Sequence, residues 1–373
     1  MRTKKTKVIR IAQIMGKWVG GGVEAVVMNY YRNIDKTKIQ FDFICDSDST
    51  DIPYEEIESL GGKVILVPPY QSVFKYRKEL KKVLKEGNYK IVHSHINTLS
   101  VFSLSAAKKA GVPVRIAHSH STTNKKEWKK NLLKKVLRPL SKKYATHYFA
   151  CTEHAGKWMF GEKASNNGNV YILNNAIDLD NFKYSKKIRD RKREELGIKE
   201  NAFVIGHIGR FVPQKNHELI INVFNEIHKE NKSAVLVLVG QGPLMDEMKE
   251  KVKELKLTRY VKFLGQRNDA NELYQAFDVF FFPSLYEGLG MVAIEAQVSG
   301  LPCVVSTEVP SIAKVTDCLE FLELEDTVNT WKNVLLDKTN EKRKSHVEEI
   351  RKAGYDIKEE VIKLEKEYLK LSK

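Results

Sequence analysis

Residues 279–300 read Val-Phe-Phe-Phe-Pro-Ser-Leu-Tyr-Glu-Gly-Leu-Gly-Met-Val-Ala-Ile-Glu-Ala-Gln-Val-Ser-Gly. The aromatic run that opens this stretch is typical of a buried strand, and the end is typical of a helix. Gly288 and Gly290 let the backbone pass close to a ligand and leave amides free at the helix start, where anions bind. Glu287 and Glu295 could each accept two hydroxyl hydrogen bonds from a vicinal diol. The spacing alone also fits an ordinary strand–turn–helix unit with two incidental glutamates.

The same alternation of short apolar runs and helix-period segments extends along the whole chain. Strands are expected at Val8–Met15, Phe41–Cys45, Lys63–Val67, Ile91–His93, Val114–His118, His147–Ala150, Val204–Ile208, Val235–Val239, Val261–Leu264, Val279–Phe282 and Cys303–Ser306. Such alternation predicts an α/β fold with parallel sheets covered on both faces. Two such series predict two doubly wound, Rossmann-like domains with ligands at the carboxyl ends of the strands.

The chain has 373 residues, which favours two domains over one. We expect an N-terminal domain over 1–182 and a charged linker without a strand pattern over 183–199. A C-terminal domain over 200–354 and a helix over 355–373 follow, and the helix is expected to pack back on the N-terminal domain.

Composition narrows the class of protein. Four scattered cysteines without a CxxC pair suit reduced thiols in a cytoplasmic protein. The basic N-terminus precedes an interrupted apolar run, which fits a first strand better than a signal peptide, and no apolar window is long enough to span a membrane. The net charge is +16, and nearly all of it falls in residues 1–182. The N-terminal half is therefore expected to meet something anionic.

The stretch with Glu287 and Glu295 resembles the E-x7-E signature of retaining glycosyltransferases of family 4, and the resemblance covers nearly the whole chain. It implies the GT-B fold, in which two Rossmann-like domains face each other across a deep cleft. It further implies that Glu287 contacts hydroxyls of the donor sugar and that Glu295 holds the ribose hydroxyls. The backbone of Gly288, Leu289 and Gly290 would approach the sugar and phosphate.

A second motif agrees with this resemblance. Gly209-Arg210-Phe-Val-Pro-Gln-Lys215-Asn216 is similar to the family's G-R-x-x-x-x-K-G element. Two fixed cations, Arg210 and Lys215, could stabilise the charge of a departing nucleoside diphosphate without a metal. Asn216 departs from the family's glycine, but asparagine tolerates the left-handed backbone. The Val239-Gly240-Gln-Gly242-Pro turn and the loop at Arg267 resemble weaker family elements near the diphosphate and the base.

In the N-terminal half, Gly21, Gly22 and Glu24 resemble the family's G-G-x-E opening, whose backbone faces the donor phosphates. Glu24 is a candidate contact of the acceptor or the sugar. The contiguous glycines do not fit a G-x-G-x-x-G dinucleotide fingerprint. In this family a catalytic histidine after an N-terminal strand contacts the donor sugar or stabilises the transition state. His118 is favoured for that role, and the count along the chain leaves His120 open.

Two motifs have residue types and spacings that occur in metal sites. His93-Ser-His95 and His118-Ser-His120 could place four imidazoles together, but no carboxylate or cysteine ligand accompanies them. His93 and His95 are expected to be strand-end residues. The D-x-D triplet Asp46–Asp48 lies in a Ser/Asp-rich turn. We expect neither a metal nor another cofactor.

The segment 124–143 has nine basic residues and one acidic residue, with an apolar stripe at helical spacing. Such a helix can lie in an anionic membrane interface, although a core-packed helix with solvated lysines fits equally well. The candidate docking residues are Lys125, Lys126, Trp128, Lys129, Lys130, Lys134 and Lys135.

Together these patterns predict a retaining, metal-independent glycosyltransferase. It would transfer a hexosyl or N-acetylhexosaminyl group from a UDP-sugar to a sugar acceptor, lipid-linked in many relatives, as in exopolysaccharide or capsule assembly. The enzyme would be cytoplasmic or peripheral on the membrane's inner face. Two alternatives remain open: a sugar-nucleotide epimerase on the same fold, and a basic membrane- or nucleic-acid-binding protein. The second lacks any RRM, KH or helix-turn-helix pattern.

Overall fold

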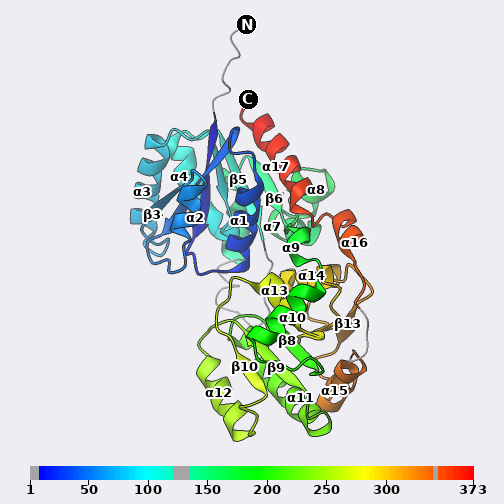
Figure 1. Cartoon of the computed structure of the whole chain (residues 1–373). Coiled ribbons are helices and arrows are strands. Elements are labelled where there is room, and N and C mark those ends of the chain that lie inside the picture. The colour runs from blue at the N-terminus through cyan, green and yellow to red at the C-terminus, as the bar shows by residue number, and fades with distance from the viewer. Residues whose placement is uncertain (1–7, 121–134, 339–342) are drawn as a thin grey trace. The chain divides into compact units, whose positions relative to one another are not determined.

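The computed structural model describes residues 8–120, 135–338 and 343–373 and divides the chain into two compact units. The first unit comprises the chain up to Ile177 together with Gly354–Lys373, and the second comprises Asp178–Ala353. Each unit is a parallel β-sheet with helices on both faces (Figure 1), as the alternation of strand and helix patterns predicts.

The first unit's sheet has the strand order β3-β2-β1-β4-β5-β6-β7. Its strands are β1 (Ile9–Gly16), β2 (Ile39–Asp46), β3 (Lys63–Val67), β4 (Ile91–Ser94), β5 (Val114–Ser119), β6 (His147–Ala150) and β7 (Val170–Ile172). Its helices are α1 (Gly22–Asn33), α2 (Tyr54–Ser59), α3 (Val73–Glu86), α4 (Ser100–Ala110), α6 (Ser141–Tyr144), α7 (Glu153–Phe160), α8 (Glu162–Asn166) and α17 (Ile357–Leu371). The central strands are apolar at consecutive positions because both faces of the sheet are covered.

Two hydrophobic clusters fill the two faces of this sheet. On one face, Ile11 of β1 packs with Tyr30 of α1 and Tyr368 of α17. On the other face, Ala12 packs with Leu80 of α3. Successive residues of β1 therefore face opposite clusters, as the two-residue period of a strand requires.

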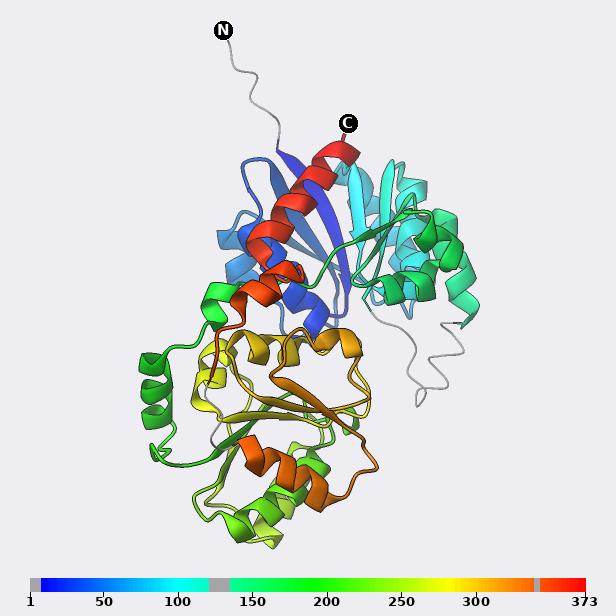
Figure 2. The ribbon, with the colours of Figure 1, turned by 90° about the vertical axis from the view of Figure 1, so that its right-hand side faces the viewer.

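The C-terminal helix α17 belongs to the first unit although the second unit precedes it in the chain. Its entry is held by a short parallel bridge, in which the Ile357 amide donates to the Ile177 carbonyl over 3.0 Å. Its buried side includes Leu364 and Tyr368. Figures 1 and 2 show this helix, in red, beside α1 and across the strands of the first sheet.

The second unit's sheet has the strand order β10-β9-β8-β11-β12-β13. Its strands are β8 (Val204–Ile208), β9 (Val235–Val239), β10 (Val261–Phe263), β11 (Val279–Phe282), β12 (Cys303–Ser306) and β13 (Leu319–Leu322). Its helices are α9 (Leu179–Phe182), α10 (Lys186–Glu195), α11 (His217–Glu230), α12 (Met245–Glu254), α13 (Ala270–Ala276), α14 (Met291–Val298), α15 (Val328–Asp337) and α16 (Val347–Lys352).

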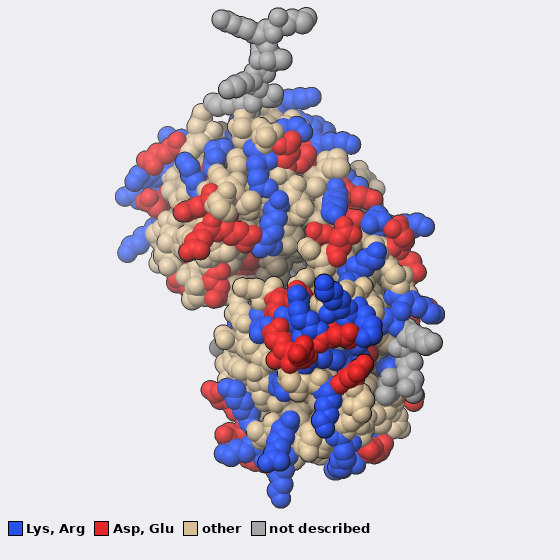
Figure 3. All heavy atoms as spheres, in the orientation of Figure 1, with Lys and Arg blue, Asp and Glu red and all other residues tan. Residues whose placement is uncertain are grey.

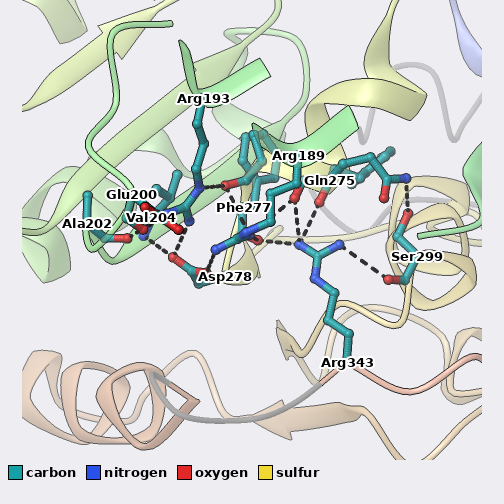
Figure 4. Close-up of polar contacts among 12 residues, drawn as sticks. Arg189, Arg193, Glu200, Ala202, Val204, Gln275, Phe277, Asp278, Ser299 and Arg343 are labelled. Atoms are coloured by element: carbon teal, nitrogen blue, oxygen red, sulfur yellow. Dashed lines mark hydrogen bonds and ion pairs between the residues drawn. The ribbon is translucent and has the colours of Figure 1, made fainter. Parts of the chain in front are cut away.

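The predicted linker over 183–199 is wrong, because most of it forms the helix α10 and packs within the second unit. Figure 4 shows how basic side chains of α10 engage the chain after α13. Arg189 donates to the Phe277 carbonyl over 2.9 Å, and Arg193 donates to Asp278 Oδ2 over 2.7 Å. Arg343 also reaches the Phe277 carbonyl. The segment has no strand pattern because it is a charged helix. Its arginines donate hydrogen bonds to the backbone carbonyls at the C-terminal end of α13.

The sequence patterns do not predict two strands, β7 and β13, and each of them forms one edge of its sheet. Both are short, and an edge strand needs less continuous apolar character than a central one.

In the parts of the chain that the structure describes, no helix has both the length and the apolar character needed to cross a membrane.

Candidate active site

The loops after β8 and β11 meet because these strands are neighbours in the second sheet. The Lys215 ammonium lies 2.6 Å from Glu287 Oε1 and 4.6 Å from the centre of the Phe282 ring. The two loops are also joined through Gln214, whose carbonyl accepts from the Leu285 amide over 2.8 Å. The structure therefore brings together a cation and a carboxylate that are far apart in the sequence, as their strand-end positions predict.

This ion pair is largely shielded from water. The side chains of Lys215 and Glu287 are 15% and 9% exposed. The ammonium has further protons to donate, and Glu287 Oε2 remains to accept from hydroxyl groups. Arg210 is exposed, and within the described residues no hydrogen bond or ion pair engages its guanidinium. The loops after β8 and β11 thus hold one paired and one unpaired cation, which suits an anionic ligand.

The turn into α14 has the backbone form that its glycines predict. Gly290 is the N-cap of α14 with a φ of 79°, and Leu289 before it is buried. Glu295 lies on this helix, and the Tyr274 hydroxyl is 2.8 Å from its Oε2 atom. Burial raises the pKa of Glu295, and the hydrogen bond from Tyr274 opposes this rise. The Tyr274 contact leaves Glu295 Oε1 to accept other hydrogen bonds.

The turn after β9 needs its glycines because two backbone segments touch there. A Cβ on Gly240 would lie 2.1 Å from the Gly209 carbonyl oxygen, and a Cβ on Gly242 would lie 2.4 Å from that of Phe211. Both glycines have positive φ angles, of 135° and 159°. Asn216, which stands where the family has glycine, adopts the left-handed backbone with a φ of 54°.

Arg267 lies in a network of charged side chains. Its guanidinium donates to Asp269 Oδ1 over 2.8 Å and to Glu195 Oε1 over 2.8 Å. These carboxylates raise the pKa of Arg267, and the hydrogen-bonded guanidinium of Arg267 in turn holds the pKa of Asp269 well below its usual range. Lys192 of α10 joins the network through both carboxylates. The predicted contact of Arg267 with the donor stays a prediction, and its guanidinium is already hydrogen-bonded.

In the first unit, Gly21 is the N-cap of α1 and Gly22 is its first residue. Glu24 turns back on this loop, where its Oε1 atom accepts from the Val19 amide over 3.2 Å. A Cβ on Gly21 would lie 2.9 Å from Glu24 Oε2. Glu24 therefore braces the glycine loop, and its predicted acceptor contact stays untested.

The four histidines of the two His-Ser-His triplets come together on β4, β5 and the residues that follow them. We call His93, His95, His118 and His120 the histidine cluster. His93 Nε2 lies 3.0 Å from His118 Nδ1, and His95 Nδ1 lies 2.9 Å from His120 Nε2. All four side chains are buried. Burial lowers their pKa values, to about 3 for His120 and well below the usual range for the others, so the rings are neutral near pH 7.

Two residues that sequence reasoning missed complete the histidine cluster. The Tyr368 hydroxyl of α17 lies 2.7 Å from His93 Nδ1, and Gln13 Oε1 of β1 lies 2.8 Å from His95 Nε2. In the described structure His118 Nε2 and His120 Nδ1 are buried without a partner. His93 and His95 are therefore more than strand-end residues, because they link the two candidate histidines to α17 and β1.

The two His-Ser-His triplets gain no carboxylate ligand from the part of the chain that the structure describes. Among the described residues, the group with metal-ligand spacing is His93, His95 and His118, each offering a nitrogen within 4.8 Å of the others. The His93 and His95 rings are stacked, with centres 4.2 Å apart and planes 28° apart. In the D-x-D triplet, burial and the charge of Asp48 raise the pKa of Asp46 to about 6.

The predicted docking residues Lys125, Lys126, Trp128, Lys129, Lys130 and Lys134 lie outside the described residues. Lys135 is described and exposed, and Val136 beside it is 61% exposed. Figure 3 shows basic and acidic side chains interspersed on the face in view, without one continuous basic patch.

Comparison with known proteins supplies the family. Residues 20–181 match the family model described as Glycosyltransferase Family 4, and residues 188–321 match that of Glycosyl transferases group 1. EpsF of Bacillus subtilis (strain 168), which is named as a glycosyltransferase, is 35% identical over 97% of this chain and 96% of its own. The chain belongs to glycosyltransferase family 4. It is therefore a glycosyltransferase with two Rossmann-like domains of the GT-B type.

One further relative and one solved structure are similar to this chain over most of its length. A protein of Escherichia coli is 28% identical over 80% of this chain and 79% of its own, and is named UDP-Gal:alpha-D-GlcNAc-diphosphoundecaprenol alpha-1,3-galactosyltransferase. The crystal structure of Anabaena Alr3699/HepE in complex with UDP and glucose matches with a TM-score of 0.78 at 18% identity, covering 97% of this chain and all of that one. At this identity the structural match shows the fold alone.

Proposed function

We propose that this glycosyltransferase takes a hexosyl or N-acetylhexosaminyl group from a UDP-sugar and transfers it, with retention and without a metal, to a lipid-linked saccharide. The observation that supports this most is the shielded pair of Lys215 and Glu287, together with Arg210 on the same loop as Lys215, whose guanidinium has no partner among the described residues. A diphosphate needs fixed cations, a sugar needs hydroxyl acceptors, and both kinds of group stand at this sheet edge.

In the proposed reaction, the bond between the anomeric carbon and the UDP oxygen breaks, and UDP leaves with the bonding electrons. Arg210 and Lys215 stabilise the charge that grows on the departing diphosphate. Glu287 Oε2 accepts from hydroxyls of the donor sugar, and Glu295 Oε1 accepts from the ribose. The acceptor hydroxyl attacks from the face that UDP leaves, and its proton passes to the departing phosphate, so that no enzymic nucleophile is required.

The relatives' names support the donor and acceptor classes. UDP is bound in the Anabaena protein, and the Escherichia coli relative is named for UDP-galactose and a diphosphoundecaprenol-linked acceptor. The basic N-terminal half and the segment 124–143 would suit an acceptor at an anionic membrane surface.

The donor is tested by incubating the protein with a panel of UDP-sugars, with and without EDTA, and by following UDP release. We expect release with one sugar that EDTA does not change. Lys215→Met and Arg210→Met should each lower kcat/KM by about 10²–10³-fold, the usual effect of losing one preorganised donor. The matched control Lys249→Met, at an exposed ion pair on α12, should leave activity unchanged. Release that requires a metal would contradict the proposal, and an epimerised UDP-sugar without transfer would identify an epimerase.

The acceptor is tested by comparing GlcNAc-diphosphoundecaprenol with free GlcNAc. We expect transfer to the lipid-linked form, and an α-configured product by the anomeric proton signal would establish retention. Flotation with anionic liposomes tests membrane docking. Neutralising the basic residues of 125–135 should reduce binding, and unchanged binding would remove that part of the proposal.

A further inference from the structure

The histidine cluster is arranged as two hydrogen-bonded arms that start from one side chain, Gln13. One arm runs from the Gln13 amide nitrogen to the Tyr368 hydroxyl over 3.3 Å, on to His93 and then to His118. The other arm runs from Gln13 Oε1 to His95 and then to His120. Gln13 and Tyr368 are each 1% exposed, so water does not compete for these bonds.

The direction of the first arm follows from the donors and acceptors available. The Gln13 amide nitrogen can only donate, so the Tyr368 oxygen accepts from it. Among the described residues the other partner of this buried hydroxyl is His93 Nδ1, so we assign the single hydroxyl proton to that bond. Because His93 is neutral, its remaining proton is on Nε2 and is donated to His118 Nδ1. His118 in turn must carry its proton on Nε2, a buried atom that has no partner among the described residues.

The second arm runs in the opposite sense. Gln13 Oε1 can only accept, so His95 carries its proton on Nε2 and leaves Nδ1 as an acceptor. His120 therefore donates from Nε2, and its unpartnered Nδ1 atom bears a lone pair. One glutamine side chain thus leaves a free donor at His118 and a free acceptor at His120.

We propose that Gln13 and Tyr368 are positioning residues that fix the tautomer of His118, so that it presents an Nε2–H donor. Buried polar atoms without partners cost free energy, and such atoms are kept where a ligand or a reaction step uses them. The use of that donor on the sugar nucleotide rests on the proposed function, whereas the tautomer itself does not. The proposal also gives α17 a task in the first unit, since Tyr368 is its contribution to the cluster.

The first test is spectroscopic and needs no substrate. Protein labelled with ¹⁵N-histidine is examined at pH 7 by long-range ¹H–¹⁵N correlation, which distinguishes Nε2–H from Nδ1–H rings. Signals are assigned with His118→Asn and His120→Asn. We expect both rings in the Nε2–H form. A His118 ring in the Nδ1–H form, or a mixture of forms in the unmodified protein, would overturn the proposal.

The second test separates the two arms. Tyr368→Phe keeps the packed ring and removes only the hydroxyl, so His118 should become a mixture of tautomers while His120 stays in the Nε2–H form. Gln13→Met has a side chain of similar length without an amide, so the His118 and His120 rings should both become mixtures of tautomers. The matched control Tyr171→Phe removes a half-buried hydroxyl on β7 that lies outside both arms. A His118 signal that neither Tyr368→Phe nor Gln13→Met changes would refute the assignment.

Kinetics then connect the tautomer to transfer. If nine-tenths of Tyr368→Phe molecules hold the wrong tautomer, kcat should fall by about tenfold, with a donor KM close to that of Tyr171→Phe. A rise in KM without a change in the His118 signal would indicate a merely structural role and would overturn the proposal.

Zinc binding provides a further test of the histidine cluster. If Zn²⁺ bound to His93, His95 and His118 in place of the hydrogen bonds, the cluster would be a metal site. If the protein showed the expected spectra but no transfer activity, the proposed function would be contradicted and the tautomer assignment would stand.

Discussion

The ion pair between Lys215 and Glu287 allows a quantitative test of the second unit. Lys215→Met keeps the length of the side chain but leaves the Glu287 carboxylate, which is 9% exposed, without its cation. Breaking a fully buried pair costs about 3–5 kcal/mol because a desolvated charge remains. The residual exposure here lets water reach the carboxylate, so we expect a loss of about 2–3 kcal/mol, near the lower end of that range. In a unit of this size such a loss lowers Tm by about 5–10 °C.

The assay is scanning calorimetry of the whole chain, with Lys215→Met, Glu287→Met and the double variant compared. The double variant replaces both charges by apolar groups, and such replacements are often neutral. It should therefore melt above either single variant, although all three should release UDP with a kcat/KM lowered by at least about 10²-fold. If Lys215→Met melted with the unmodified protein, or if the double variant melted below both single variants, the ion pair would not carry the stability assigned to it.

Two more outcomes follow from the geometry. Gly242→Ala should destabilise the second unit and weaken UDP binding, measured by thermal shift, because its Cβ would lie 2.4 Å from the Phe211 carbonyl oxygen. Gly197→Ala, which also has positive φ but open space around its Cβ, should cost only about 1–2 kcal/mol. The pKa values of the histidine cluster are lowered by burial, so the unfolded chain binds more protons below about pH 6.5. The free energy of unfolding should therefore decrease as the pH is lowered, by about 1.4 kcal/mol per pH unit for each buried ring. Replacing His120 by Asn should make the urea midpoint less sensitive to pH between 6.5 and 4.5.

Much of the fold is local enough to be predicted. Each of the eleven expected strands overlaps a strand of the structure, because buried strands are marked by consecutive apolar residues. The prediction of a linker over 183–199 is wrong because a charged helix lacks a strand pattern just as a linker does. The charges of this segment in fact pair with partners far along the chain, as Arg193 does with Asp278.

The residues of the candidate site can also be predicted from the sequence, whereas their contacts depend on the order of the strands. Glu287, Glu295, Arg210 and Lys215 were found from motifs because each stands in a loop or helix that directly follows a strand, and strand ends of a parallel sheet share one edge. The contact of Lys215 with Glu287 then follows from β8 and β11 being neighbours.

The sequence by itself determined two doubly wound units, their family and the residues at the strand ends. Only the tertiary structure decided how the four histidines are bonded and which side chains orient them. Gln13 and Tyr368 are 355 positions apart, and no period or motif spans that distance. They meet because α17 returns to bury its apolar face on the first sheet, and in that buried place the Gln13 amide and the Tyr368 hydroxyl bond to each other.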